Sequence, residues 1–397
     1  MCKIPGGPRL CWEIAAMRII LLLGAGGIPL LSLQPPGPKI GPAVKIRLDH
    51  LPGPEFRAGG QTYLYFGGTA YLGLQQLPEF KALLAEATLR MGTHWGASRG
   101  GNVVVDVYAE AEQKLAAWTG SEAALTLSSG FLAGRLLAEF YARDPYSCFY
   151  SPSCHAALLP PGARRAAGWA DLRSALLTFL KNHPERQAVL FTDSLDFNNS
   201  PGPVNETLKT LPAESCLLVA DDSHGLGVLG PRGNGAFSGL RALGFRKLLV
   251  CASLGKAMGV TAGVVLGPSE ILKELEQTPL YSGASPAPPA SVATLAQALD
   301  SGLYARQREK LLRNLSYFAE RIGQVSGLQG IPGHPVWTFR DPSLAEGLYT
   351  RGILVTHFDY PAEGSTGSPS RIVLSAAHSE EQIGRLASQI CDLRGLS

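Results

Sequence analysis

Residues 216–263 read CLLVADDSHGLGVLGPRGNGAFSGLRALGFRKLLVCASLGKAMGVTAG. Two short apolar runs in this stretch, 217–220 and 247–252, each predict a buried parallel strand. The first run ends in Asp221-Asp222-Ser223-His224 and the second in Ser253-Leu254-Gly255-Lys256. Because open α/β sheets carry their chemistry at strand ends, we expect functional side chains at both places.

Lys256 and Asp221 have the chemistry that pyridoxal 5'-phosphate (PLP) requires of a protein. The PLP aldehyde forms a Schiff base with a lysine, and a carboxylate keeps the ring nitrogen protonated so that the ring acts as an electron sink. His224, three residues beyond Asp221, is placed to bond the ring hydroxyl. A solvated Asp-Asp turn and a surface lysine are the alternative interpretation, against which the two predicted strands argue.

The stretches DDSHGLGVLG and SLGKAMG resemble signatures of the α-oxoamine synthases, which are fold-type I PLP enzymes, and in particular those of 8-amino-7-oxononanoate synthase. The resemblance covers about residues 44–395. It implies an α/β fold with two parts. The large domain contains a mostly parallel, seven-stranded-type sheet flanked by helices, and the C-terminal domain is smaller and α+β.

The domain boundaries follow from the same comparison and from local composition. Residues 1–43 are expected to be a disordered leader, and residues 44–95 an N-terminal segment that packs with the small domain. Residues 96–290 form the predicted large PLP-binding domain and residues 291–397 the small domain. Residues 290–325 predict one long amphipathic helix.

Further cofactor-binding residues are implied by the resemblance. Ser129, Gly130 and Phe131 follow an apolar strand and begin a helix, where free backbone N–H groups make an anion site that suits the PLP phosphate. Across the chain, the predicted cofactor-binding residues are Ser129, Gly130, Phe131, His155, Asp193, Asp221, His224, Ser253, Lys256 and Ser282.

The family gives most of these residues a specific task. His155 matches the histidine that stacks on the PLP ring, and Asp193 takes the acidic position under the cofactor. Ser253 matches a hydroxyl that binds the phosphate, and Ser282 one that reaches the phosphate of the partner subunit. The predicted catalytic residues are Lys256, Asp221, His224 and His155.

The implied reaction is a PLP-dependent acyl transfer. An amino acid, alanine by the resemblance, condenses with an acyl thioester, pimeloyl by the resemblance, with loss of carbon dioxide, as in biotin synthesis. The acyl carrier is CoA or an acyl carrier protein, and family members are homodimers. Arg371 is the candidate anchor for the amino-acid carboxylate, because Pro369 stands where the family has its arginine.

Three alternatives remain open from the sequence. An aminotransferase-like PLP enzyme would use a keto acid as acceptor, and a PLP-binding protein without turnover would keep the same cofactor residues. A serine hydrolase would use Ser98 in GASRG as its nucleophile, although RMGTHW before it does not read as the buried strand that such an elbow needs. The chain also departs from the family pattern at several positions, among them Tyr108 in place of a histidine, Gly134 in place of an asparagine and Phe197 in place of a serine.

Composition excludes several other classes of protein. The chain of 397 residues is 45% apolar with a formal charge of +3, and it has no clustered basic face that would bind nucleic acid. Its seven cysteines are scattered without CxxC pairs, which argues against a disulfide framework and a zinc site. The apolar run after Arg18 is interrupted by Gly and Pro and is too short to predict stable membrane insertion. We therefore expect a cytoplasmic enzyme without a metal.

Overall fold

The computed structural model describes residues 45–198, 201–323, 325–357 and 369–395. The predicted leader, residues 1–43, lies outside them. A six-stranded sheet is the centre of the described chain, and its strands follow one another in the order β3, β10, β9, β8, β5, β4. Their bounds are β3 Ala123–Leu127, β4 Tyr146–Tyr150, β5 Gln187–Asp193, β8 Cys216–Asp221, β9 Lys247–Ser253 and β10 Gly263–Gly267.

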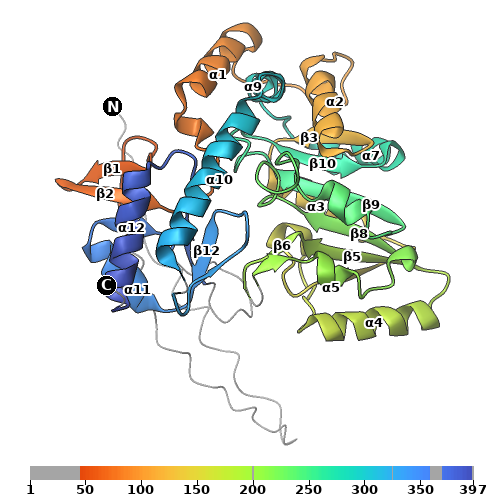
Figure 1. The fold of residues 1–397 in the computed structure, drawn as a ribbon. Helices are drawn as coiled ribbons and strands as arrows, with labels where there is room; N and C mark the ends of the chain where they lie inside the picture. The colour runs from red at the N-terminus through yellow and green to blue at the C-terminus, as the bar shows by residue number, and fades with distance from the viewer. Residues whose placement is uncertain (1–44, 199–200, 324, 358–368, 396–397) are drawn as a thin grey trace, which may run out of the picture. The chain divides into compact units, whose positions relative to one another are not determined.

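Parallel pairing brings the carboxyl ends of three central strands to one edge. β4, β5, β8 and β9 pair parallel in turn, whereas β10 runs antiparallel to both β9 and β3. Figure 1 shows β5, β8 and β9 side by side. In this register Asp193 lies opposite Asp221, and Asp221 lies opposite Cys251. The last residues of these strands are therefore neighbours.

The sheet is apolar because helices cover both of its faces. Alternate residues such as Leu190 and Leu218 share a core with α4 and α6, while Val189 and Val219 share another with α3 and α7. Strands buried on both faces are rich in Val, Leu and Ala. The surrounding helices are α3 Gly130–Phe140, α4 Trp169–Asn182, α5 Asn205–Leu208, α6 Phe237–Arg241, α7 Ser269–Glu276 and α8 Pro279–Gly283, with 3-10 turns η1 Leu74–Gln76, η2 Ala156–Leu158 and η3 Ala213–Ser215.

The remaining strands form small separate sheets. The N-terminal segment pairs with the C-terminal part of the chain, because β2 lies between β1 and β13 and aligns Leu64 with Ile353. The bounds are β1 Glu55–Ala58, β2 Gln61–Phe66 and β13 Ile353–Val355 in one sheet, β11 Gln329–Gly330, β12 Val336–Phe339 and β14 Ser370–Val373 in a second, and β6 Leu195–Asp196 and β7 Gly202–Pro203 in a third.

The predicted α/β fold with a mostly parallel sheet is confirmed, with one difference in detail. The central sheet has six strands in the described residues where seven were expected. Strands from the two ends of the chain pair with each other in one separate small sheet, where β2 pairs with β13.

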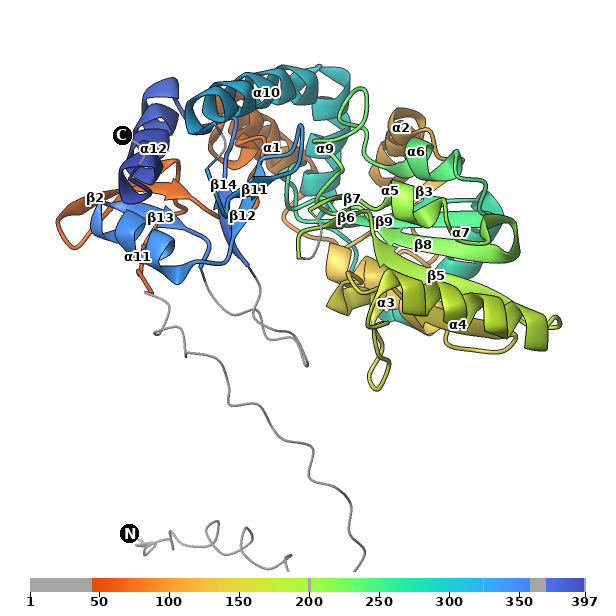
Figure 2. The same cartoon turned by 60° about the horizontal axis from the view of Figure 1, so that its bottom comes forward.

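The long helix predicted for residues 290–325 is two helices. α9 spans Pro289–Asp300 and α10 spans Leu303–Ile322, and Gly302 between them has a φ of 68°. A left-handed residue ends a helix, and glycine adopts that conformation at little cost. Figure 2 shows α10 beside α12 (Glu380–Leu393). The other helices are α1 Pro78–Met91, α2 Val107–Thr119 and α11 Pro342–Thr350.

Residues 371–378 read RIVLSAAH, and the last of them, His378, joins the C-terminal segment to β2. Its Nδ1 accepts from the Ser375 N–H at 2.9 Å, its Nε2 donates to the Tyr65 carbonyl at 2.9 Å, and its ring stacks on Phe66 with centroids 4.1 Å apart. Burial lowers the pKa of His378 to about 4. The native ring is thus held neutral.

The neutrality of His378 predicts a pH dependence of stability. An unfolded histidine has a pKa of about 6.5, so between pH 6.5 and 4 the unfolded chain binds a proton that the native ring does not. The contribution of His378 to stability is complete above pH 6.5 and is lost as the pH falls toward 4. We expect the difference in unfolding free energy between wild type and His378→Gln to shrink by about 2 kcal/mol from pH 7 to pH 5, measured by denaturant titration. A difference that stays constant over this range would contradict the assignment.

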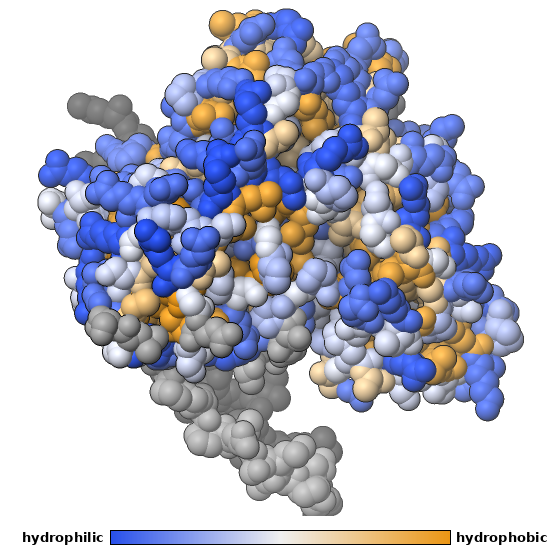
Figure 3. Space-filling view, in the orientation of Figure 1, coloured by the Kyte–Doolittle hydropathy of each residue, from blue (hydrophilic) through white to orange (hydrophobic). Residues whose placement is uncertain are grey.

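None of the helices in the described residues is both long and apolar enough to cross a membrane. Figure 3 shows polar residues over most of the visible face, with apolar residues gathered near its middle.

Candidate active site

Lys256 follows β9 in a short turn, and its amine lies among charged side chains from several elements. Burial lowers the pKa of Lys256, and Arg371 lowers it further, while the carboxylates of Asp221 and Asp193 act in the opposite direction. Lys256 therefore lies within electrostatic range of three predicted site residues. Its amine is neutral more often than that of an exposed lysine, and a neutral amine is the nucleophilic form.

Asp221 ends β8 with its side chain almost fully buried. Its Oδ1 accepts from the Ser223 N–H at 2.8 Å, and its Oδ2 lies 3.8 Å from Nδ1 of His155. Burial lowers the pKa of His155, and its Nδ1 accepts from the Ala157 N–H at 3.2 Å, so this approach to Asp221 is a contact with a neutral ring. Asp221 keeps a free carboxylate oxygen directed toward the His155 ring.

Asp193 lies beside Asp221 in the parallel register and fixes the backbone of His155. Its Oδ1 accepts from the His155 N–H at 2.8 Å. Burial raises the pKa of Asp193 well above its usual range, and the neighbouring carboxylate of Asp221 adds to that effect. The contact explains how an acidic residue on β5 can orient the predicted stacking histidine.

The start of α3 packs directly against the end of β9. Ser129 caps the helix, since its hydroxyl accepts from the Leu132 N–H at 3.1 Å. A Cβ on Gly130 would lie 2.5 Å from Cα of Ser253, so no other residue fits there without moving the backbone. The Ser223 hydroxyl accepts from the Ser253 N–H at 2.8 Å. The predicted phosphate turn and the strand before Lys256 are thereby held together.

His224 contacts a residue that the sequence did not assign to the site. Its Nδ1 lies 2.6 Å from the hydroxyl of Tyr71, in the YLGL segment, and the carbonyl of His224 accepts from Nε2 of His334 at 3.0 Å. Both partners are buried. Tyr71 begins YLGL (residues 71–74), a segment that resembles one in the α-oxoamine synthases, whereas His334 is a single histidine without such a resemblance.

Arg371, on β14, reaches the same cluster. Its guanidinium lies over the ring of Phe197, 4.8 Å from the centroid, and Asp193 and Tyr71 interact with it electrostatically. Burial lowers the pKa of Arg371, although it stays charged at neutral pH. Two departures from the family pattern, Phe197 and the arginine displaced from position 369, are therefore in contact with each other.

The structure does not bring all the predicted residues into this cluster. The Phe131 side chain is 56% exposed, so only its backbone can face a phosphate. Ser282 lies on α8, where its hydroxyl donates to the Thr278 carbonyl at 3.0 Å and its own carbonyl accepts from the Ser98 hydroxyl at 2.6 Å. These contacts keep Ser282 at the loop of Ser98.

The serine hydrolase alternative is wrong. Residues 92–106 connect α1 to α2, and no strand is assigned there, whereas a nucleophile elbow is a strand-to-helix turn. Next to Ser98, Arg99 forms a partly buried ion pair with Glu112 and lies 4.5 Å from the centroid of Tyr108. The contacts of Arg99 thus hold this loop in place, and the hydroxyl of Ser98 makes a structural hydrogen bond within it.

Two other departures also have a structural reason. Tyr108 is buried and donates to the Ala287 carbonyl at 2.7 Å, so it carries the Arg99 contact and ties α2 to the chain before α9. A Cβ on Gly134 would lie 2.8 Å from Cβ of Ala157. The turn after His155 packs on α3 where an asparagine would not fit.

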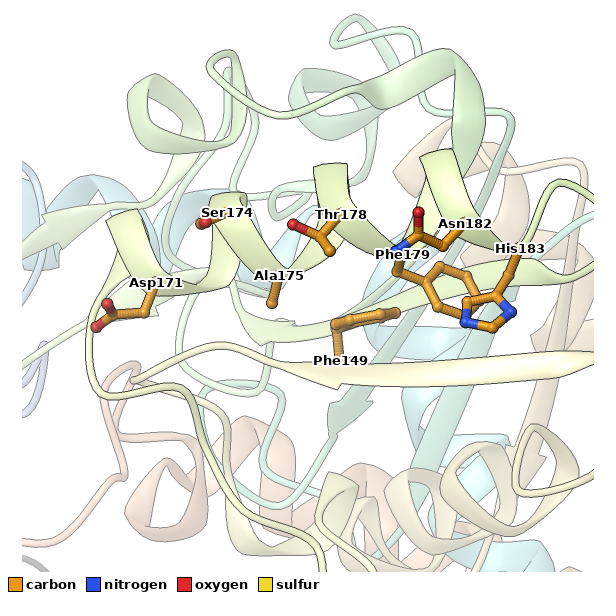
Figure 4. A pocket seen from close by; sticks show the side chains of 8 residues that line it. All are labelled: Phe149, Asp171, Ser174, Ala175, Thr178, Phe179, Asn182 and His183. Atoms are coloured by element: carbon orange, nitrogen blue, oxygen red, sulfur yellow. The ribbon is translucent and has the colours of Figure 1, made fainter.

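A groove separate from this cluster lies between β4 and α4 (Figure 4), and it contains none of the predicted site residues. Phe149 and Phe179 form part of its wall, with ring centroids 5.2 Å apart. It is lined by Phe149, Asp171, Ser174, Ala175, Thr178, Phe179, Asn182 and His183.

Within the part of the chain that the structure describes, no group of three or more His, Cys, Asp or Glu side chains is arranged to hold a metal ion.

Comparison with known proteins assigns the class that this fold and cluster suggest. The model of the family "Aminotransferase class I and II" matches residues 64–390, and the chain belongs to that family. The chain is 28% identical over 351 residues to the 8-amino-7-oxononanoate synthase of Cellvibrio japonicus (strain Ueda107), covering 84% of this chain and 87% of that protein.

Solved structures share the fold. The serine palmitoyltransferase of Sphingomonas wittichii matches with a TM-score of 0.73 at 20% identity, covering 88% of this chain and 91% of that one. The 8-amino-7-oxononanoate synthase of Francisella tularensis matches with a TM-score of 0.61 at 21% identity, covering 83% and 97%. The predicted fold-type I architecture and PLP cofactor are confirmed, and so is the resemblance to the α-oxoamine synthases.

The residues present fit PLP. Lys256 offers an amine with a lowered pKa, and Asp221 offers a buried carboxylate at the end of the neighbouring strand. α3 begins at Gly130, where the first N–H groups of a helix have no partner within the helix and attract an anion. The close approach at Gly130 leaves this end of α3 beside Ser253.

Proposed function

We propose that this protein condenses an amino acid with an acyl thioester, with loss of the amino-acid carboxylate as carbon dioxide. The observation that carries the proposal is the meeting of Lys256, Asp221 and Arg371 in one cluster. This cluster supplies a base, a partner for the cofactor ring and a cation for a carboxylate. The names of the relatives support alanine and a pimeloyl thioester as the substrates, as in biotin synthesis.

The contacts of the cluster support the following cofactor-binding roles. Lys256 would hold PLP covalently, and Asp221 would stabilise a proton on its ring nitrogen. His155 would stack on the ring, and its N–H bond to Asp193 would orient it. His224 would bond the ring hydroxyl, and the N-terminus of α3 with Ser253 would hold the phosphate.

The catalytic roles then follow from charge and protonation. PLP, when bound, withdraws the electron pair that is released at the amino-acid α-carbon. Arg371 binds the amino-acid carboxylate through two parallel hydrogen bonds. The neutral amine of Lys256 takes the proton from the α-carbon, and burial of the site favours that neutral form.

The overall reaction balances without an external oxidant. The α-carbon of the amino acid forms a bond to the thioester carbonyl, the carbon–sulfur bond breaks, and the thiol leaves with a proton. The bond from the α-carbon to the carboxylate breaks to release carbon dioxide, and a proton replaces it. The products are an aminoketone, a thiol and carbon dioxide.

We propose two further features, a division into domains and a dimer. Residues 96–290 form the large domain and residues 291–397 the small one, with residues 44–95 joined to the latter through β2 and β13. Two copies of the chain form a homodimer in which Ser282 reaches the PLP phosphate of the neighbouring copy. Size-exclusion chromatography with multi-angle light scattering tests the dimer, since a monomeric mass would exclude it.

Arg371 provides a prediction about substrate binding. Loss of a bidentate bond in a shielded site costs about 1.5 to 3 kcal/mol, so Arg371→Ala should weaken alanine binding by about tenfold to a hundredfold. The measurement is the alanine-dependent change in PLP absorbance, with PLP content confirmed beforehand. Arg313→Ala, which removes an arginine that pairs with Glu309 on α10, is the control. Equal alanine affinity in Arg371→Ala and wild type would show that another group holds the carboxylate.

The reaction class is tested by a substrate screen. Purified holoenzyme is incubated with single amino acids and acyl-CoA thioesters of increasing chain length, and free thiol is measured. Thiol release that requires both substrates is expected, with alanine and pimeloyl-CoA as the best pair. In parallel reactions with a keto acid in place of the thioester, amino transfer without any thiol release in the screen would replace the proposal by an aminotransferase. PLP absorbance without either activity would replace it by a PLP-binding protein.

A further inference from the structure

His224 is enclosed by aromatic residues from distant parts of the chain. Phe197 packs its ring edge against His224 with centroids 5.1 Å apart, and Tyr71 lies 6.1 Å away. His334 contacts both of these neighbours, at 5.4 Å from each. The imidazole of His224 therefore has little freedom to rotate.

The backbone of His224 is also fixed. His334 is 1% exposed, and its Nε2 donates to the His224 carbonyl at 3.0 Å while its Nδ1 accepts from the Val336 N–H at 3.3 Å. Burial lowers the pKa of His334 to about 4, so this ring is neutral and has one donor and one acceptor, both of which are used.

The contact between Tyr71 and His224 has a direction. The hydroxyl of Tyr71 is 2.6 Å from Nδ1 of His224, and among the described residues this nitrogen is its single hydrogen-bond partner. Tyr71 is 1% exposed. If Nδ1 carried the imidazole proton, the buried phenol proton would lack an acceptor, which costs about 1 to 3 kcal/mol. The phenol therefore donates.

The protonation states of both groups agree with that direction. Burial raises the pKa of Tyr71, so the phenol keeps its proton. Burial lowers the pKa of His224 well below its usual range, and Lys256, Arg371, His334 and His155 lower it further. A neutral imidazole whose Nδ1 accepts a hydrogen bond carries its proton on Nε2.

We propose that Tyr71 fixes His224 in the tautomer with the proton on Nε2, so that His224 donates a hydrogen bond to the ring hydroxyl of PLP. Tyr71 is a positioning residue in this scheme, because it acts through His224. The proposal rests on the cofactor-binding role proposed for His224. It also assigns a role to the YLGL segment, whose Tyr71 lies 153 residues before the histidine that it orients.

The tautomer can be measured without PLP or substrates. In cofactor-free protein labelled with 15N-histidine, two-bond proton–nitrogen correlations show which imidazole nitrogen carries the proton, and His224→Asn identifies the signals. Wild type should show His224 protonated on Nε2. Tyr71→Phe keeps the ring and removes the hydroxyl, and it should populate the Nδ1-protonated form. Tyr108→Phe, which also removes a buried hydroxyl, is the matched control and should leave the His224 signals in place.

A second readout is the affinity for PLP. Tyr71→Phe should weaken PLP binding about fivefold, the size expected for one hydrogen bond, while Tyr108→Phe stays within about twofold of wild type. A wild-type His224 protonated on Nδ1 would overturn the proposal, and this result does not depend on the folding of any variant. An unchanged tautomer or unchanged PLP affinity in folded Tyr71→Phe would also overturn it. Neither readout uses an amino acid or a thioester, so failure of the proposed condensation is detected separately.

Discussion

Lys256→Ala is expected to lose covalently attached PLP and to lower turnover by about a thousandfold or more. The lysine amine is the group that bonds to the cofactor aldehyde and the base that takes the α-proton, and positioned bases contribute about 10²- to 10⁴-fold. The amine suits both tasks because burial lowers its pKa and the carboxylates of Asp221 and Asp193 lie in electrostatic range.

The measurement is borohydride reduction followed by intact mass and peptide mapping. Wild type should gain one reduced PLP at Lys256, and Lys256→Ala should gain none. Lys247→Ala is the matched control, because Lys247 begins the same strand but forms a surface pair with Glu270 at 2.7 Å. A reduced adduct on a different lysine in wild type, or one that persists in Lys256→Ala, would remove Lys256 from the centre of the site.

Asp221→Asn is expected to keep PLP and to lose activity by about a hundredfold to ten-thousandfold. The carboxylate stabilises a proton on the ring nitrogen, and an amide of the same shape cannot, so the ring withdraws fewer electrons from the α-carbon. The Ser223 N–H can still donate to the amide oxygen, so the turn after β8 should survive. Steady-state turnover together with PLP content measures this effect.

Asp222→Asn separates a catalytic carboxylate from a structural one. Asp222 is buried and accepts from the Ser194 hydroxyl at 2.6 Å and the Ala236 N–H at 2.7 Å. Its substitution should lower the thermal midpoint more than that of Asp221→Asn, with a smaller loss of turnover per folded molecule. Equal turnover in wild type and Asp221→Asn would assign Asp221 to the fold alone.

The parts of the site that lie at strand ends could be predicted from the sequence. Apolar runs ending in polar residues placed Asp221 and Ser253 at the ends of two strands, and the structure ends β8 and β9 at these residues. Gly130 could be predicted as well, because a strand entering Ser-Gly and then a helix has few other uses. Such signals are local, since the hydrophobic period of a strand or helix and the residues of the turn that follows it lie within about ten residues of each other.

Contacts between distant segments could not be predicted in the same way. The Tyr71–His224 and His334–His224 bonds join residues 153 and 110 positions apart, and a single histidine in the sequence gives no sign of its partner. The contact of Arg371 with Phe197 is of the same kind, because each residue alone looked like a departure from the family. The break between α9 and α10 was missed for a different reason, since the apolar period continues across Gly302 and only its left-handed backbone divides the helix.

Stoichiometry with a carboxyl-labelled substrate tests the central claim most directly. Holoenzyme is given [1-13C]alanine and pimeloyl-CoA, and labelled carbon dioxide and free CoA thiol are quantified in the same reaction. Condensation with decarboxylation predicts that the two appear in equal molar amounts, each dependent on the other substrate. Labelled pyruvate formed in a parallel reaction that also contains a keto acid as amino acceptor, with neither labelled carbon dioxide nor thiol released, would contradict the proposed function.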